Sequence, residues 1–169
     1  MKIDKAHQAF YTHNAKYAQF LETQDVACFE KYVDALITSS KTNNHILEVG
    51  CGTGIALNYL QSKANRNLHG VDISQSSIKI AQKKGLNCSV YDGSLLPFKN
   101  KSFNVVGSIN TLEHTDDPTL FLDENLRVLK KNGILIVACP NFLSVTNNYH
   151  YHTRGIIQKI RNMFGIITR

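Results

Sequence analysis

The chain has 169 residues, of which 43% are hydrophobic and 19% charged, a composition that excludes a disordered or fibrous protein and suits one globular domain. No apolar run is long enough to span a bilayer, and no apolar stretch follows the N-terminal lysines, so we expect neither a membrane span nor a secretory signal. Four scattered cysteines without metal-ligand spacing predict reduced thiols, no metal site and a cytoplasmic location.

The net charge of +6 is unevenly distributed. Residues 125–169 carry seven lysines and arginines and no acid, whereas residues 1–124 are close to neutral. Such a basic segment can meet anionic lipid, nucleic acid or an acidic partner, or it can be a solvated surface, and charge alone does not choose. We divide the chain into an N-terminal helical cap (1–44), an α/β core (45–141) and a basic, partly helical tail (142–169).

The predicted elements begin with two helices, at residues 5–21 and 24–39, where apolar side chains recur at helical spacing. From there on, short apolar strands alternate with helices: strands at 45–49, 67–71, 86–91, 103–109 and 134–138, and helices at 53–64, 74–84 and 118–130. Ser74 is the expected N-cap of one helix, and Pro118 suits the first turn of another. The Asn-Gly pair at 132–133 is the expected stop signal of that last helix.

Alternating strands and helices indicate βαβ units with right-handed crossovers. We therefore predict an α/β fold: an open, doubly wound, Rossmann-like and mostly parallel sheet of five strands in the order 3-2-1-4-5, preceded by the N-terminal helices. A ligand would lie in the crevice at the carboxyl ends of the strands. Residues 134–138 are apolar on both faces, so either the tail covers this strand, a second chain pairs with it, or the chain is a truncated product.

The strongest motif is ILEVGCGTG at residues 46–54, a strand that carries Glu48 and leads through Gly50, Gly52 and Gly54 into a helix. Glycine accepts positive φ and lets a ligand lie against bare backbone. The G-x-G-x-G spacing differs from the G-x-G-x-x-G of dinucleotide-binding loops, and an acid here would repel a pyrophosphate but suit an ammonium group. A tight turn without a ligand is the alternative, which the preceding acid and the strand-to-helix context disfavour.

Asp72 ends the second predicted strand, in the spacing at which an acid binds the ribose hydroxyls of an adenine nucleoside. A single aspartate at a strand end is commonly a helix N-cap or a turn residue. After this glycine-rich loop, ribose binding is the interpretation that we prefer.

Four segments together resemble the class I S-adenosylmethionine-dependent methyltransferases, in particular the small-molecule group that includes the quinone-biosynthesis methyltransferases. The resemblance covers residues 46–141 and depends on EVGCGTG (48–54), VDIS (71–74), YDGSLLPF (91–98), and NTLEH (110–114) leading to RVLKKNGI (127–134). It implies S-adenosyl-L-methionine as cofactor, S-adenosyl-L-homocysteine as product, and methyl transfer to an oxygen or carbon nucleophile of a small molecule.

The resemblance also implies residues for the methionine end of the cofactor. Glu48 and the Gly50–Gly54 loop, Cys51 included, would hold this end. Asn110, after the fourth strand, would contribute backbone beside it. Tyr17, on the N-terminal helix, would line the same end of the cofactor.

For the nucleoside, the resemblance implies a second set of residues. Asp72 would hold the ribose hydroxyls and Ile73 would pack on the adenine. Asp92 would accept from the adenine amino group, with Gly93 and Ser94 lending backbone.

The reaction implied is in-line attack on the sulfonium methyl, to which the protein contributes mainly proximity and orientation. A general base helps when the nucleophile is a hydroxyl or an acidic carbon. His114 is the first candidate for that base or for a substrate contact, and the alternative is a loop histidine beside a helix start. Glu113 is expected to bond loop amides, and Tyr11 is expected to pack against its own helix.

Other functions stay open. The sixth and seventh strands of similar enzymes are not recognisable, so a cofactor-binding but inactive or partner-dependent subunit is the first alternative. The basic tail motivates an RNA methyltransferase, but the Pro-Cys of such enzymes is replaced by Asn110-Thr111, Cys139 is expected to be buried, and we expect no nucleic-acid partner. The glycine spacing disfavours an NAD-dependent oxidoreductase. The tail could rest on a membrane surface, contact a second copy or dock on its own domain.

Overall fold

The computed structural model describes residue 11 and residues 14–64 and 66–140. The chain separates into two compact units, Met1–Ala138 and Cys139–Arg169, and the described helices and strands all belong to the first. The predicted tail helix lies outside the described residues. Among the helices of the described part, none is long and apolar enough to cross a membrane.

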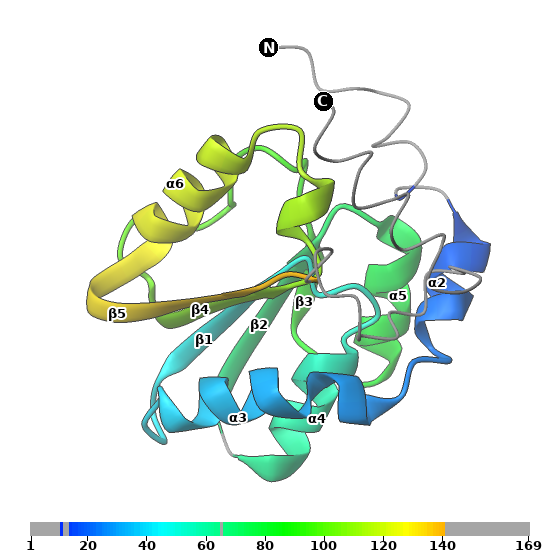
Figure 1. Ribbon diagram of the computed structural model, residues 1–169, viewed down its shortest axis with the longest axis horizontal. Coiled ribbons are helices and arrows are strands. Elements are labelled where there is room, and N and C mark those ends of the chain that lie inside the picture. The colour runs from blue at the N-terminus through cyan, green and yellow to red at the C-terminus, as the bar shows by residue number, and fades with distance from the viewer. Residues whose placement is uncertain (1–10, 12–13, 65, 141–169) are drawn as a thin grey trace, which may run out of the picture. The chain divides into compact units, whose positions relative to one another are not determined.

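Five parallel strands form one sheet, in the order β3-β2-β1-β4-β5 (Figure 1). Their bounds are β1 His45–Val49, β2 Asn67–Asp72, β3 Cys88–Val90, β4 Phe103–Ile109 and β5 Leu129–Ala138. The predicted fold and strand order are therefore confirmed. The direction of winding reverses between β1 and β4, so a ligand crevice is expected at the carboxyl ends of these two strands.

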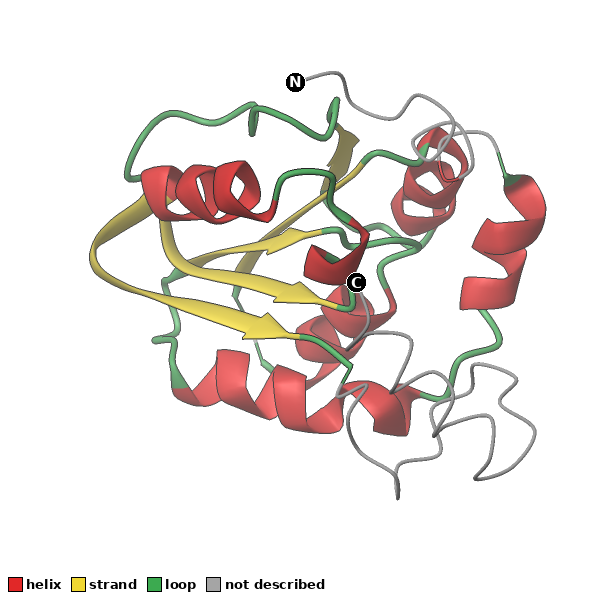
Figure 2. Cartoon of the chain, turned by 45° about the horizontal axis from the view of Figure 1, so that its top comes forward, coloured by secondary structure: helices red, strands yellow, loops and turns green. Residues whose placement is uncertain are grey.

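Helices cover both faces of the sheet. Their bounds are α2 Ala15–Leu21, η1 Val26–Phe29, α3 Glu30–Thr38, α4 Ile55–Lys63, α5 Gln75–Lys83, η2 Leu112–His114 and α6 Pro118–Val128. Helices α3 and α4 lie on one face and α6 on the other, while α5 runs beside β3 and α2 packs against α5 (Figures 1 and 2).

Two helix starts agree with the sequence. Ser74 caps α5, since its hydroxyl accepts a hydrogen bond from the Ser77 N–H at 3.2 Å. Pro118 occupies the first turn of α6, where it needs no N–H partner, and Asp117 caps the helix by accepting from the Leu120 N–H at 2.9 Å.

The two predicted N-terminal helices both differ from their predicted bounds. Asn14 is extended and accepts a hydrogen bond from the Tyr17 N–H at 3.0 Å, so α2 begins at Ala15; residues 5–10 and 12–13 of the first predicted helix lie outside the described residues. The second predicted helix starts at Val26 with a 3₁₀ turn, η1, and continues without a break as α3. Asp25 caps its start by accepting from the Ala27 N–H at 2.9 Å. Polar capping residues, Asn14 and Asp25, are the physical reason for both helix starts.

The prediction for residues 132–133 was wrong, because helix α6 already ends at Val128 and this pair lies inside β5. Leu129 is paired with Phe103, while Ile134 is paired with Val105, so β5 carries extra residues at an irregularity. Asn132 has a φ of 62°, and the Asn-Gly pair therefore forms a bulge within the strand.

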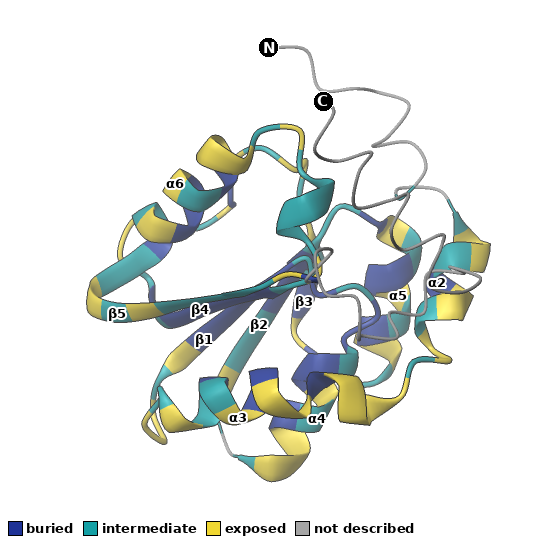
Figure 3. Cartoon of the chain, in the orientation of Figure 1, coloured by how far each residue is buried: buried dark blue, intermediate teal, exposed yellow. Residues whose placement is uncertain are grey.

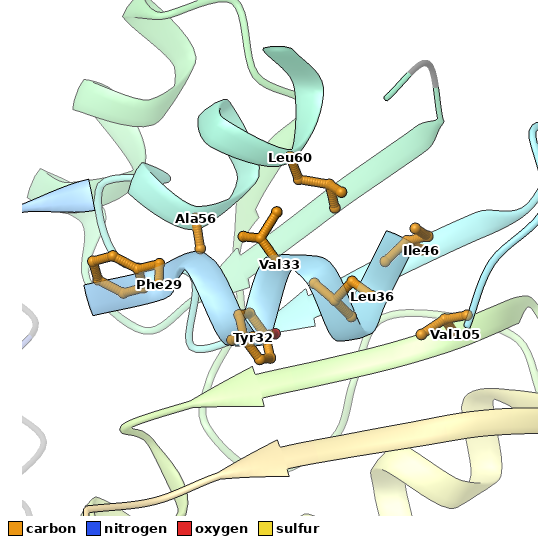
Figure 4. Close-up of a cluster of buried hydrophobic side chains, with 8 residues drawn as sticks. All are labelled: Phe29, Tyr32, Val33, Leu36, Ile46, Ala56, Leu60 and Val105. Atoms are coloured by element: carbon orange, nitrogen blue, oxygen red, sulfur yellow. The ribbon is translucent and has the colours of Figure 1, made fainter. Parts of the chain in front are cut away.

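Alternate side chains of β1 enter the cores on the two faces of the sheet. Ile46 packs under α3 with Phe29, Val33 and Leu36 (Figure 4). Leu47 and Val49 pack on the opposite face, with side chains that include Phe121 and Val128 of α6. Glu48 shares the α3 face with Ile46, and this position fixes the surroundings of its carboxylate.

Strand β5 differs from the buried central strands, because none of its ten residues is fully buried (Figure 3). Ile134 is 42% exposed, and within the described residues β5 is paired with β4 alone. The prediction that Cys139 is buried was wrong. Cys139 is exposed, because β5 ends at Ala138 and the cysteine lies just beyond the strand.

Candidate cofactor and active site

The loop between β1 and α4 depends on its glycines. Gly50, Gly52 and Gly54 have φ values of 80°, 53° and 77°, a region that residues with a side chain rarely adopt. A Cβ atom at Gly50 would overlap the Thr111 side chain, and one at Gly54 would overlap Leu86. The loop therefore presents bare backbone at the carboxyl end of β1.

Backbone hydrogen bonds fasten this loop to the end of β2. The N–H groups of Gly50 and Cys51 both donate to the Val71 carbonyl oxygen, at 2.8 and 3.0 Å. The Gly52 N–H donates to Asp72 Oδ2 at 2.8 Å. The loop and the end of β2 thus form one unit.

Asp72 joins the glycine loop to the turn that leads into α5. Its Oδ2 accepts from Gly52, and its Oδ1 accepts from the Ser74 N–H at 2.8 Å. Burial raises the pKa of Asp72, although these backbone hydrogen bonds oppose the shift. Asp72 therefore has the turn role that the sequence offered as an alternative, and its carboxylate keeps acceptor capacity that a ribose hydroxyl can use.

Glu48 is 1% exposed and lies in the sheet between two glycines, Gly70 of β2 and Gly107 of β4. Its Oε2 atom is buried and, among the described residues, has no hydrogen-bond partner. Burial raises its pKa well above the ordinary range, and the charges of Cys88 and Asp72 act in the same direction. A buried carboxylate oxygen without a partner is costly unless a cation or a donor supplies the missing interaction.

Tyr32 extends from α3 toward the strands, where its hydroxyl lies over Gly107 (Figure 4). Burial raises its pKa well above the ordinary range, and the nearby Glu48 charge adds to the shift. Sequence reasoning treated Tyr32 only as part of a helix, because nothing local links it to β1 or β4.

The segment after β3 contains the residues expected at the adenine. Asp92 Oδ1 accepts hydrogen bonds from the Ser94 N–H at 2.9 Å and from the Ser94 hydroxyl at 2.8 Å. These bonds, led by that from the Ser94 backbone, lower the pKa of Asp92. Gly93 has a φ of 86°, as the tight turn requires. The charges of Asp72 and Asp92 both raise the pKa of the largely buried Tyr91, after burial itself, so the two acids lie near one side chain.

Three other side chains of the site were missed. Thr111 fills the space over Gly50, and its Oγ1 donates to the Ile109 carbonyl oxygen at 3.1 Å. Leu21 of α2 lies 3.1 Å from the point that a Gly52 Cβ would occupy. Lys84 Nζ donates to the Thr53 carbonyl oxygen at 3.1 Å and to Glu22 at 2.7 Å. Only Thr111 had a signal in the sequence, its place at the end of a predicted strand.

Asn110 and Ile73 lie where the sequence expects them, at the ends of β4 and β2. Asn110 has a φ of 52° and donates its N–H to the Ala138 carbonyl oxygen at 2.8 Å, so its backbone turns sharply at the mouth of the sheet. Ile73 is half-buried directly after Asp72.

His114 is brought together with two tyrosines from the N-terminal segment. Tyr11 Oη lies 3.3 Å from His114 Nδ1, and the Tyr11 ring meets the Tyr17 ring edge-on with centroids 5.1 Å apart. Tyr11 was expected only to pack against its own helix, but it also contacts His114, the candidate base.

Glu113 lies on the other side of the His114 ring, with Oε1 3.9 Å from His114 Nε2. Both carboxylate oxygens of Glu113 are buried, and in the described part of the chain neither has a hydrogen-bond partner. The expected bonds from Glu113 to loop amides are therefore not formed.

The parallel sheet of this order, the G-x-G-x-G loop after β1 and the acid at the end of β2 define the class I S-adenosylmethionine-dependent methyltransferases. The family model described as a methyltransferase domain matches residues 47–137, and the chain belongs to this family. S-adenosyl-L-methionine is therefore its cofactor.

Relatives include enzymes of quinone biosynthesis. The 2-methyl-6-phytyl-1,4-hydroquinone methyltransferase of Synechocystis is 36% identical over 55% of this chain and 31% of its own length. The ubiquinone biosynthesis O-methyltransferase of Pelagibacter ubique is 30% identical over 59% of this chain and 43% of its own. The chain thus spans less than half the length of both relatives.

A similar solved structure is that of a candidate S-adenosylmethionine-dependent methyltransferase from Methanococcus maripaludis. It matches with a TM-score of 0.66 at 18% identity, over 73% of this chain and 62% of that one. At this identity the likeness concerns the fold alone.

Proposed function

We propose that the chain transfers the methyl group of S-adenosylmethionine to an oxygen or carbon nucleophile of a small molecule. The observation that carries the proposal is the buried, unpaired Oε2 of Glu48 in the strand that leads into the bare glycine loop. This combination suits a ligand that combines an ammonium group with a part that must lie against backbone. The methionine end of the cofactor has both properties.

In this proposal, Glu48 and the loop of Gly50, Cys51, Gly52 and Gly54 hold the methionine end. Asn110 contributes backbone there, and Tyr17 lines the same end. The Glu48 carboxylate and the backbone carbonyl oxygens are hydrogen-bond acceptors, which is what the ammonium group of a cationic ligand needs.

Asp72 holds the ribose hydroxyls with the lone pairs that Gly52 and Ser74 leave available. Ile73 packs on the adenine. Asp92, with Gly93 and Ser94, meets the adenine amino group.

When bound, the cofactor supplies an electrophilic methyl group. His114 is proposed to accept the proton of the acceptor nucleophile, and a neighbouring carboxylate stabilises the imidazolium that results. Glu113, 3.9 Å from His114 Nε2, is in position for this role. Tyr11 contacts Nδ1, so Nε2 is the ring nitrogen that accepts the proton in this proposal.

The proposal also includes the partners of the protein and its location in the cell. The quinone-biosynthesis relatives support a small-molecule acceptor without a nucleic-acid partner, and salt-sensitive RNA binding would contradict this part. The cysteine pattern supports a cytoplasmic location. We also retain the division into a cap (1–44), a core (45–141) and a tail (142–169), with the tail as the segment for a membrane or homo-oligomer contact.

A second candidate function is a cofactor-binding subunit that is inactive by itself. Strand β5 favours this candidate, because in the described residues its outer edge has no partner and its side chains are incompletely buried. Methyl transfer that begins only when another chain is added would support it. Turnover by the chain alone would exclude it.

Calorimetric titration with S-adenosylmethionine tests the proposal. Asp72→Ala removes the ribose acceptor and one anchor of the loop, so affinity should fall at least about tenfold. Asp34→Ala, which changes an exposed acid on α3, is the matched control and should bind like the unaltered chain. Equal affinity in the two variants would contradict the assignment.

A further inference from the structure

Two buried thiols lie directly beside the cofactor loop. Cys88 of β3, Gly70 of β2 and Glu48 of β1 are neighbours in register across the sheet. Cys51 belongs to the glycine loop itself and lies over the same row. The exposed fractions of Cys51 and Cys88 are 7% and 5%.

Gly70 makes room for the two sulfur atoms. A Cβ atom at this position would lie 2.7 Å from Cys51 Sγ and 2.8 Å from Cys88 Sγ. Any side chain here would therefore displace both thiols. Because Gly70 has no side chain, Cys51 of the loop and Cys88 of the sheet can both pack over it.

The two sulfur atoms pack against the same point over Gly70, and Cys51 Sγ donates to the Gly52 carbonyl oxygen at 3.8 Å. The interaction between the two thiols lowers the pKa of Cys88 and raises that of Cys51. Thiolate is the nucleophilic form of cysteine, so we take Cys88 as the sulfur that reacts first with an oxidant.

We propose that Cys51 and Cys88 are a redox site: a peroxide converts them into a disulfide that distorts the glycine loop and weakens cofactor binding. The effect on binding rests on the function proposed above. The formation of the disulfide does not depend on that function.

The chemistry balances with hydrogen peroxide as the oxidant. The Cys88 thiolate attacks one peroxide oxygen, and the O–O bond breaks to give a sulfenic acid and hydroxide. Cys51 sulfur then attacks the Cys88 sulfur and expels the second hydroxide, while the two thiol protons convert both hydroxides into water. Two thiols are thereby oxidised to one disulfide, and one peroxide is reduced to two waters.

The disulfide changes the loop because a sulfur–sulfur bond is about 2 Å long, well below the separation of two thiols that are not covalently bonded. Cys51 must therefore move toward β3. Gly50 and Gly52 flank it and permit the movement, but the Gly52 N–H to Asp72 bond and the bare backbone beside Cys51 move with it. Linkage is reciprocal, so bound cofactor should also shift the thiol–disulfide equilibrium toward the two thiols.

The experiment uses the full chain with Cys28→Ser and Cys139→Ser, which removes the two exposed cysteines. Hydrogen peroxide should produce a species lighter by two hydrogen masses, with one Cys51–Cys88 cross-linked peptide after digestion. S-adenosylmethionine affinity should fall at least about tenfold and recover after dithiothreitol. Cys88→Ala in the same background should bind the cofactor before peroxide treatment and stay unaffected by it.

Two results would overturn the proposal. One is a failure to form the cross-link under peroxide; the other is a quantitative cross-link that leaves affinity unchanged. A reduced chain that binds no S-adenosylmethionine would instead contradict the proposed function, while the mass measurement would still report on the thiol pair.

Discussion

At the scale of single residues, the site depends on positions where a side chain is absent and on one carboxylate without a partner. The three loop glycines, Gly70 and Gly107 are all positions at which a Cβ would meet a neighbouring side chain. Glu48 lies between the last two and keeps a buried oxygen unpaired. The motif and its acid were recognisable from the sequence, because the local pattern contains them. Gly70 and Gly107 could not be assigned to the site from the sequence, because only the register of the strands places them beside Glu48.

Gly50→Ala tests the steric part of this account, with Gly85→Ala as its matched control. Both glycines have a φ of 80°, but a Cβ at Gly85 meets nothing within 4 Å, whereas one at Gly50 overlaps Thr111. Gly85→Ala should lower the free energy of unfolding by about 1 kcal/mol, and Gly50→Ala by about 3 kcal/mol. Urea denaturation measures both, and equal losses would contradict a steric requirement at Gly50.

Glu48 should make the cofactor-free chain less stable as pH rises. The pKa of Glu48 is raised in the folded chain, mainly by burial, so the folded state keeps a proton that the unfolded chain releases above about pH 4.3. The free energy of unfolding then falls by about 1 kcal/mol per pH unit until the folded pKa is passed.

Glu48→Gln removes this titration, so its stability should fall less steeply than that of the unaltered chain between about pH 5 and about pH 8. The raised pKa of Asp72 acts in the same direction in both proteins and therefore cancels in the comparison. Urea denaturation across this range measures both slopes. Parallel slopes would show that Glu48 is ionised in the folded chain.

At the scale of elements, helix α6 holds the segment that follows β3. Arg127 binds the Glu124 carboxylate through Nε and Nη2, each at 2.7 Å, and its Nη atoms also donate to the carbonyl oxygens of Phe98 and Leu96. Glu124 in turn accepts from the Leu96 N–H at 2.8 Å. This pair thus replaces regular secondary structure in positioning the chain between β3 and β4.

Arg127→Lys should therefore destabilise the fold although it keeps the charge, because an ammonium group cannot make the forked contacts. We expect a loss of about 2 kcal/mol in the free energy of unfolding, with Lys131→Ala, an exposed neighbour, close to zero. Thermal denaturation monitored by circular dichroism measures both variants. A loss of unfolding free energy equal to that of Lys131→Ala would contradict the role of the Arg127 guanidinium contacts.

The helices and strands differ in how well the sequence alone predicts them. All five strands were recognised because each contains a short apolar run, and the α5 cap was recognised because Ser74 bonds within its own turn. The prediction that the Asn-Gly pair at 132–133 ends a helix was wrong, because the same residue types also form a bulge within a strand. The contact of Tyr11 with His114 joins residues 103 positions apart, and no local pattern encodes such a distance.

At the scale of the molecule, the N-terminal segment and the core meet at the cofactor loop. Leu21 approaches Gly52, and Glu22 pairs with Lys84 at 2.7 Å. Tyr11 of the same segment contacts His114 and packs edge-on against Tyr17. Binding at the loop should therefore order the cap as well as the core.

Hydrogen exchange measures this coupling. S-adenosylmethionine should increase the protection of residues 15–21, with a smaller change in residues 30–38 of α3, whose side chains are already packed in the core. Lys84→Ala should reduce the gain in α2. Protection that changes only in the core would contradict the coupling of cap and cofactor.

A crystal structure of the chain with S-adenosylmethionine tests the central claim most directly. The account predicts the cofactor ammonium within hydrogen-bonding distance of Glu48 or the Gly50–Gly54 backbone, and the ribose hydroxyls on Asp72. A cofactor that binds elsewhere, or one that leaves Glu48 Oε2 buried and unpaired and Asp72 without a ribose contact, would contradict it.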